Sequence, residues 1–125
     1  MKIIIQTSSM IPIYEQIVQQ IKALILHQDI QENEALPSVR SLSKDLKISA
    51  LTVKKAYDTL EEEGFTKTIH GKGTYVCRPN PTFMKEEILK EIESEFEQII
   101  QKAHHYHLTD EEIQNIFTLT LEDSI

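Results

Sequence analysis

The first long run of apolar residues follows the period of an α-helix. After Pro12, apolar side chains recur every three or four positions, at Ile13, Ile17, Ile21, Leu24 and Ile25. This spacing places them on one face of a helix. A proline suits the first turn, because its missing N–H would have no partner there. We predict a helix over residues 12–27, followed by a polar connection over residues 29–37 that is too irregular for a strand.

Two shorter helical patterns follow, separated by a tight turn at residues 47–49. Pro37 and Ser38 begin the first of them. Ser49 is placed to cap the second, and Gly64 ends it because glycine readily adopts the left-handed conformation beyond a helix terminus. The inward faces comprise Val39, Leu42 and Leu46 in the first helix and Val53, Ala56, Tyr57 and Leu60 in the second. Tyr57, and Tyr75 further along the chain, are interpreted as core aromatics.

Residues 65–76 change to a pattern typical of extended chain. The threonines, Ile69, Tyr75 and Val76 favour extended chain, and Gly71 and Gly73 can supply a turn between two strands. We predict a β-hairpin here. The short apolar segment at residues 2–5 is interpreted as a third strand beside it.

A second amphipathic region begins after the stiff linker at residues 78–81. Its first apolar stripe predicts a helix of about six turns, which ends in the segment HHYHL at residues 104–108. Thr109 and Glu112 then fit a capping box at the start of a last helix. The apolar residues of these two helices that are predicted to form a dimer interface are Ile88, Ile92, Phe96, Ile99, Ile100, Ile113, Ile116 and Phe117.

The predicted fold is mostly α with a small β-hairpin, in two parts. Residues 1–78 form a three-helix head with the hairpin, and residues 79–125 form a two-helix tail. One long stripe and one short helix cannot bury each other in a core of their own, so the tail exposes an apolar patch that calls for a partner. The simplest partner is an identical chain, and the tail is therefore predicted to form a homodimer.

The charge is divided between the parts. The chain has a formal net charge of −7, yet residues 34–78 carry a net charge of +2, whereas residues 79–125 carry −8. A basic segment in an acidic chain suggests one part that contacts a polyanion and another that avoids it.

Three helices followed by a hairpin, with a tight turn between the second and third, is the order of a winged helix-turn-helix. In that design the start of the third helix enters the major groove of DNA. Here that start is small, hydroxylic and basic, while its far end holds three glutamates at residues 61–63. The residues predicted to contact DNA are Arg40, Ser49, Ala50, Leu51, Thr52, Lys54, Lys55, His70, Gly71, Lys72 and Gly73.

Other functional classes find little support in the sequence. A single cysteine, Cys77, excludes an intramolecular disulfide framework. No apolar run approaches the ~20 residues of a membrane-spanning helix, and the amino terminus does not resemble a secretory signal. No nucleotide-binding or hydrolase motif is present. We expect a cytoplasmic protein that is not an enzyme, requires no cofactor and does not bind membranes.

A histidine cluster suggests a metal sensor as an alternative. His104, His105 and His107 carry imidazoles of the kind that bind Zn²⁺. Their spacing is not i, i+4 and no cysteine lies nearby, so we interpret the segment as a corner between two helices, without a metal.

The segment LPSVRSLSKDLKISALTVKKAYDTLEEEGFTKTIHGKGTYV, residues 36–76, resembles the DNA-binding head of the GntR family of bacterial regulators, and PIYEQIVQQI, residues 12–21, resembles that family's first helix. The resemblance implies DNA contacts at Arg40, at the start of the third helix and in the hairpin turn. Family members often have Arg or Asn where this chain has Ala50, whose methyl group can instead touch thymine.

The short tail resembles the YtrA-like subfamily, whose helical tails dimerise. This resemblance implies a homodimeric repressor that binds a palindromic operator and controls an adjacent transporter operon. A small-molecule effector, if one exists, would use the dimer interface or the cleft between head and tail. The alternative from another class is a winged-helix adaptor that binds a protein partner and has no specific affinity for DNA.

Overall fold

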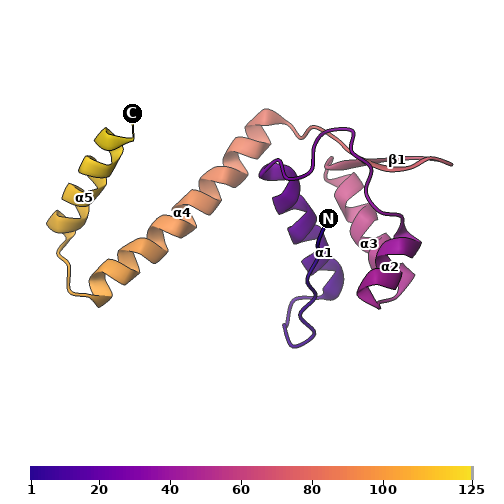
Figure 1. The fold of residues 1–125 in the computed structure, drawn as a ribbon, viewed down its shortest axis with the longest axis horizontal. Helices are drawn as coiled ribbons and strands as arrows, with labels where there is room; N and C mark the ends of the chain where they lie inside the picture. Colours follow the sequence, from indigo (N-terminus) through magenta and orange to yellow (C-terminus); the bar gives the residue numbers. More distant parts are fainter. Residues whose placement is uncertain (125) are drawn as a thin grey trace. The chain divides into compact units, whose positions relative to one another are not determined.

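The computed structural model describes residues 1–124, which form two compact units. The first comprises Met1–Pro81, and the second begins at Thr82. The described residues contain five α-helices and one two-stranded antiparallel sheet (Figure 1). The prediction of a mostly helical chain with a small hairpin is confirmed.

Three helices form the core of the first unit. Helix α1 (Ile13–Leu26) packs against α3 (Ala50–Glu62), and α2 (Val39–Leu46) packs on the other side of α3. The apolar stripes predicted for α1 and α3 converge here, and the largest fully buried side chains are Phe65, Ile17, Ile21, Leu60 and Val53. Helix α3 is thereby fixed on two sides, and its remaining face is exposed.

The predicted helix boundaries follow from local capping. The Ser38 and Ser49 hydroxyls accept hydrogen bonds from the N–H groups of Ser41 and Thr52, at 3.0 and 3.1 Å. Lys47 adopts the left-handed conformation, with φ of 57°, and so makes the turn between α2 and α3 tight. These caps fix the angle at which α3 leaves the turn.

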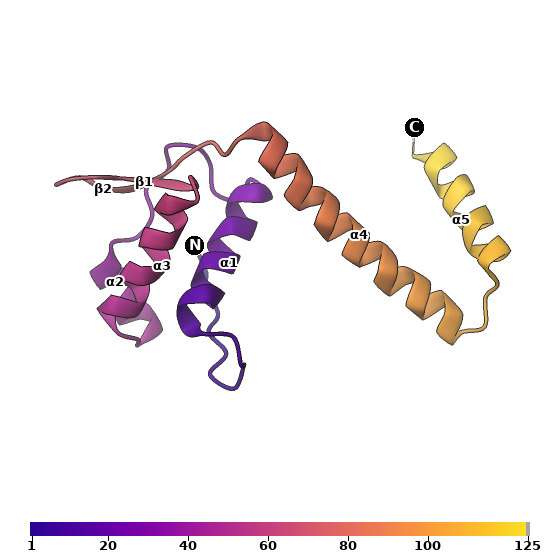
Figure 2. The ribbon, with the colours of Figure 1, turned by 180° about the vertical axis from the view of Figure 1, so that it is seen from behind.

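Strands β1 (Thr66–Ile69) and β2 (Gly73–Val76) form the predicted hairpin, with Thr66 opposite Val76 and Ile69 opposite Gly73. The φ angles of Gly71 and Gly73, +78° and +131°, lie in the region that favours glycine. The prediction of a hairpin with a glycine turn is confirmed, and it follows α3 directly in the chain (Figure 2).

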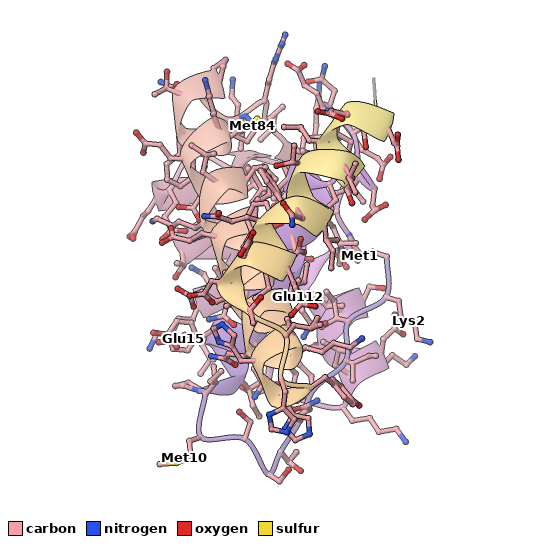
Figure 3. All side chains as sticks on the ribbon, turned by 90° about the vertical axis from the view of Figure 1, so that its left-hand side faces the viewer. Met1, Lys2, Met10, Glu15, Met84 and Glu112 are labelled. Carbon is pink, nitrogen blue, oxygen red and sulfur yellow. The ribbon has the colours of Figure 1, made fainter. Side chains whose placement is uncertain are left out.

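The prediction of a third strand at residues 2–5 is wrong. Ile3 is buried in the core, but the backbone of Ile4 is held by the side-chain amide of Gln20, which accepts a hydrogen bond at 2.9 Å and donates one at 2.7 Å. Gln16 holds Gln6 in the same manner. These glutamine amides take the place of a neighbouring strand. The loop that follows is exposed at Met10 (Figure 3).

The connection at residues 29–37 is more ordered than its polar sequence suggested. Ala35 forms an isolated antiparallel bridge with Tyr75. The N–H of Leu36 donates to the carbonyl of Thr74, and the N–H of Val76 donates to that of Glu34, both at 2.9 Å. The segment therefore ties the outer edge of β2 to the head.

The second unit contains α5 (Asp110–Asp123) and all of α4 (Pro81–His105) except its first residue, Pro81, which belongs to the first unit. Helix α4 begins at Pro81, inside the segment predicted to be linker, in the first-turn position that proline tolerates. The capping box of Thr109 and Glu112 is present at the start of α5, where Figure 3 labels Glu112. Among residues 1–124, no helix combines the length and apolar character needed to cross a membrane.

Tyr57 ties α3 to the start of α2, and its ionisation predicts a pH dependence of stability. Its buried O–H donates to the carbonyl of Pro37 at 2.7 Å, and burial raises the pKa of this phenol well above its ordinary value. The unfolded chain releases this proton near pH ~10, whereas the folded chain retains it. Stability is therefore fully present below that pH and falls as pH rises beyond it.

A Tyr57→Phe variant is expected to unfold more easily at neutral pH by about 1 kcal/mol, for the lost hydrogen bond. It is also expected to lose part of the alkaline decline in stability, measured by urea denaturation from neutral pH to above pH ~10. Tyr106→Phe, at an exposed position of the second unit, is the control. An unchanged alkaline decline in Tyr57→Phe would contradict this role for Tyr57.

Candidate nucleic-acid interface

The first turn of α3 presents a mixed surface of small, hydroxyl and apolar side chains. Ala50 and Leu51 are exposed, and the hydroxyls of Ser49 and Thr52 are hydrogen-bonded to each other at 2.7 Å. Because the Ser49 hydroxyl also caps the helix, both hydroxyls hold the turn in shape. The unpaired N–H groups and the positive end of the helix dipole attract an anion at this terminus.

Two lysines flank this turn on the exposed side of α3. The Lys54 ammonium lies 2.8 Å from a carboxylate oxygen of Asp58, and this hydrogen bond, with the charge of Asp58, raises the pKa of Lys54. The Lys55 ammonium lies 4.0 Å from the centre of the Tyr14 ring on α1, in a cation–π contact. The lysine pair noted in the sequence is thus oriented by two different neighbours.

Arg40 and the hairpin turn supply the other predicted contacts. Arg40 is exposed in the first turn of α2. His70, Gly71 and Lys72 are exposed in the turn between β1 and β2, and Gly73 is exposed at the start of β2. The hairpin leaves the far end of α3, about 20 Å from its first turn at 1.5 Å per residue. The predicted contacts therefore lie at the start of α3, at the start of α2 and in the hairpin turn.

Two of the three glutamates at the far end of α3 have structural partners that the sequence did not indicate. Glu63 forms a salt bridge with Lys22 of α1. Glu61 accepts a hydrogen bond from the N–H of Thr68 at 3.2 Å, which joins α3 to β1. Glu61 and Glu63 thus fasten α3 to its neighbours at the end away from the lysine pair.

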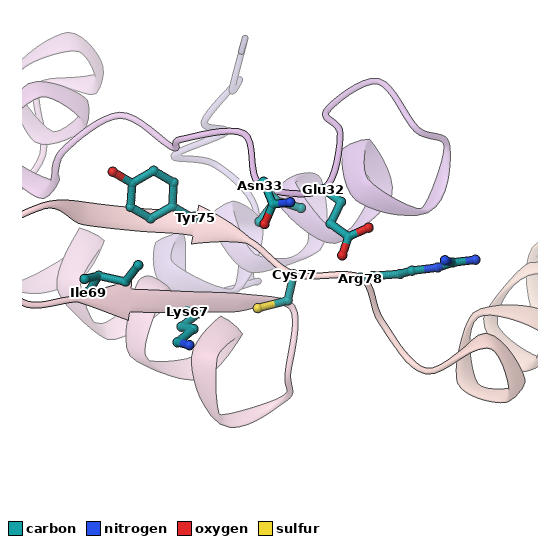
Figure 4. Close-up of a pocket in the computed structure, with 8 residues that line it drawn as sticks. Glu32, Asn33, Lys67, Ile69, Tyr75, Cys77 and Arg78 are labelled. Atoms are coloured by element: carbon teal, nitrogen blue, oxygen red, sulfur yellow. The ribbon is translucent and has the colours of Figure 1, made fainter.

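An open cleft of about 440 Å³ lies along the hairpin (Figure 4). Lys67 and Ile69 of β1 and Tyr75 of β2 line it, together with Cys77 and Arg78 just after β2. Arg78 adds an exposed cation that sequence reasoning did not include among the candidate contacts. Tyr75 is half-buried here rather than a full core residue, and its hydroxyl donates to the carbonyl of Lys72 at 3.3 Å.

The arrangement of α1 to α3 and the hairpin is shared with known regulators. Residues 13–76 match the family model described as bacterial regulatory proteins, gntR family. This chain belongs to the GntR family. The family is one of regulatory proteins, so the expectation that the chain is a regulator and not an enzyme is confirmed.

One relative also matches much of the tail of this GntR chain. The HTH-type transcriptional repressor YtrA of Bacillus subtilis is 40% identical over 101 residues, which cover 81% of this chain and 78% of that protein. The resemblance to YtrA-like members is confirmed by this match.

Two solved structures have the same fold. A transcriptional regulator from Oenococcus oeni is 30% identical with a TM-score of 0.69, over 94% of this chain and 97% of that one. The DNA-binding domain of AraR, solved in complex with operator ORX1, is 25% identical with a TM-score of 0.55, over 61% of this chain and 95% of that one.

The tail of this GntR chain exposes the apolar faces predicted for it. Between α4 and α5 lies an apolar groove of about 780 Å³. The Phe96 and Phe117 rings meet edge to face across it, with centroids 6.0 Å apart. The predicted residues Ile88 and Ile113 are half-buried, and the exposed ones are Ile92, Phe96, Ile99, Ile100, Ile116 and Phe117.

The histidines at the corner of the tail do not converge. The His104 Nε2 atom lies 2.7 Å from a carboxylate oxygen of Asp110, His105 packs edge to face on Tyr106, and His107 has a positive φ of 64°. Within residues 1–124, no three His, Cys, Asp or Glu side chains gather as a metal site requires. The corner between α4 and α5 is built by these local contacts.

Proposed function

We propose that this protein is a cytoplasmic repressor that binds a palindromic operator as a homodimer. The observation that carries the proposal is the exposed first turn of α3 with the two lysines that follow it, in a chain whose net negative charge is concentrated in the tail. It is supported by the names of the relatives, among them a YtrA repressor and an AraR domain bound to its operator.

In this proposal, α3 enters the major groove by its first turn. Lys54 and Lys55 lie beside that turn, and Arg40 starts the adjoining helix, where its guanidinium can grip a phosphate or a guanine edge. The hairpin turn contacts the neighbouring backbone through Lys72 and the N–H groups around the two glycines. Neutralised phosphates release counterions, which supplies much of the affinity.

In this proposal, the tail joins two copies of the chain. The apolar side chains of α4 and α5 remain exposed in the single chain, and a two-fold interface can bury the same stripe of both copies against each other. Two heads joined in this way read two half-sites whose centres are about one DNA turn, ~10 base pairs, or a multiple of it apart.

The experiment is a selection of bound duplexes from a random library by the purified full-length chain, together with gel shifts on DNA upstream of its own gene. The expected result is an enriched inverted repeat whose affinity falls steeply with rising salt concentration. Weak binding that is indifferent to sequence would contradict the proposal, and capture of a protein partner without DNA affinity would favour the adaptor alternative.

Lys54→Ala is expected to weaken binding to the selected duplex by tenfold or more, since charge-assisted contacts are worth about 1.5–3 kcal/mol. Glu62→Ala, at the opposite end of α3, is the matched control and is expected to leave the affinity nearly unchanged. Both are measured by fluorescence anisotropy. Equal losses in the two variants would mean that α3 does not approach DNA by its first turn.

A further inference from the structure

Leu51 is exposed where the fold gives it no partner. It is 79% exposed in the first turn of α3, while Val53 and Ala56 of the same helix are completely buried. Isolated apolar residues are common on protein surfaces. This one, however, stands beside the exposed methyl group of Ala50, in the middle of the turn proposed to face the DNA bases.

The polar side chains around Leu51 are already engaged. Ser49 and Thr52 share a hydrogen bond of 2.7 Å. Lys54 is paired with Asp58 at 2.8 Å, and Lys55 lies on the ring of Tyr14. Helix α3, with sequence ALTVKKAYDTLEE, also contains no Arg, Asn or Gln. It therefore lacks the side chains that pair in two-pronged fashion with guanine or adenine through a guanidinium or an amide.

We infer that Leu51 reads thymine by packing on its 5-methyl group in the major groove. This inference rests on the proposed function and specifies what the site recognises. The 5-methyl group of thymine is the apolar feature of the major-groove edge, and apolar side chains are its partners. A cytosine at that position would present an amino group to Leu51 without an acceptor, which disfavours it.

The test removes only the methyl group. Each thymine of the duplex recovered by the selection is replaced in turn by deoxyuridine, which pairs identically. Binding of the full-length chain to each duplex is measured by fluorescence anisotropy. At one position in each half-site, the wild-type chain is expected to lose about fourfold in affinity, from about 0.8 kcal/mol per buried methyl-sized group, and to lose more when both half-sites are changed.

The Leu51→Ala variant tests the same contact by changing the protein instead of the DNA. It is expected to bind the thymine duplex more weakly than the wild type does and to be indifferent to deoxyuridine at that position. Leu51→Asn, which carries an amide, is expected to shift the preference there towards adenine. The folded state of both variants is checked by circular dichroism, since an exposed side chain contributes little to the core.

The possible outcomes distinguish a failure of the proposed function from a failure of the thymine contact. If the selection enriches no sequence, the proposed function fails, and this inference fails with it. If a sequence is enriched but no deoxyuridine weakens wild-type binding, or if Leu51→Ala keeps the full deoxyuridine effect, the thymine contact of Leu51 is wrong and the regulator account stands. A Leu51→Ala variant that changes the oligomeric state but not the affinity would assign this residue to a protein contact instead.

Discussion

An Ile99→Glu variant is expected to be monomeric and to bind the palindromic duplex about 100-fold more weakly than the wild type, or weaker still. Ile99 is 58% exposed in the single chain, on the groove side of α4. A carboxylate there costs little in the monomer, but in the proposed interface it would be desolvated without a partner. In a dimer, binding of one head to its half-site holds the other head close to the second half-site, at a high effective concentration. A monomer lacks this advantage, so its affinity for the palindrome is lower.

The matched control is Gln98→Glu, which adds the same charge one residue earlier, at an exposed position outside the groove lining. Mass is measured by sedimentation, and affinity by anisotropy on duplexes with one or two half-sites. The Ile99→Glu and Gln98→Glu proteins are expected to bind a duplex with a single half-site equally well. A dimeric Ile99→Glu protein, or a monomeric one with full affinity for the palindrome, would show that the tail does not join the heads in this way.

A Phe65→Ala variant is expected to lower the free energy of unfolding of the head by about 3–5 kcal/mol. Phe65 is only 1% exposed, directly between α3 and β1. Its N–H donates to the carbonyl of Leu60, and its carbonyl accepts from the N–H of Cys77, both at 2.9 Å. The ring also lies under the Lys22 ammonium, 5.2 Å from the ring centre. Its loss leaves a cavity at the point where α1, α3 and the hairpin meet.

Urea denaturation followed by circular dichroism measures this loss, with exposed Leu51→Ala as the control, which is expected to change stability by less than about 0.5 kcal/mol. Because the head carries the predicted contacts, Phe65→Ala is also expected to bind DNA poorly at temperatures where the wild type is fully folded. A loss below about 1 kcal/mol would mean that the cavity collapses or that Phe65 is not the centre of the core.

The helices of the head were predictable because their signals are local. The period of Ile17 and Ile21 identifies α1, and the serines at positions 38 and 49 mark the starts of α2 and α3. The capping box of α5 is equally local. Each of these features depends on residues only three or four positions apart in the chain, so no knowledge of tertiary contacts was needed.

The prediction of a strand at residues 2–5 was wrong because strand pairing depends on contacts between residues distant in sequence. Whether an apolar segment pairs with a strand depends on what lies beside it, and here the amides of Gln16 and Gln20 occupy its backbone. Conversely, Ala35 joins Tyr75 although its surroundings are polar, because α1 and α2 bring that connection to the edge of β2. Partners distant in sequence leave no periodic signal.

The residues predicted to contact DNA also combine local features, which the sequence shows, with contacts distant in sequence, which it does not show. Their exposure and basic charge were readable from the sequence, but the stacking of Lys55 on Tyr14 and the fastening of Glu61 to Thr68 were not. The sequence places three glutamates at the far end of α3 but indicates no partner for them. The structure adds that two of them hold α3 in place, so the charge distribution along this helix also serves the fold.

An amide NMR titration of the 125-residue chain with the selected duplex tests most directly whether the first turn of α3 enters the groove. The account predicts that the largest shifts occur at residues 49–55, at Arg40 and at residues 70–73, while amides of α4 and α5 change little. If the specific duplex binds and the amides of residues 49–52 do not shift, the first turn of α3 is not in the groove, and the account is contradicted.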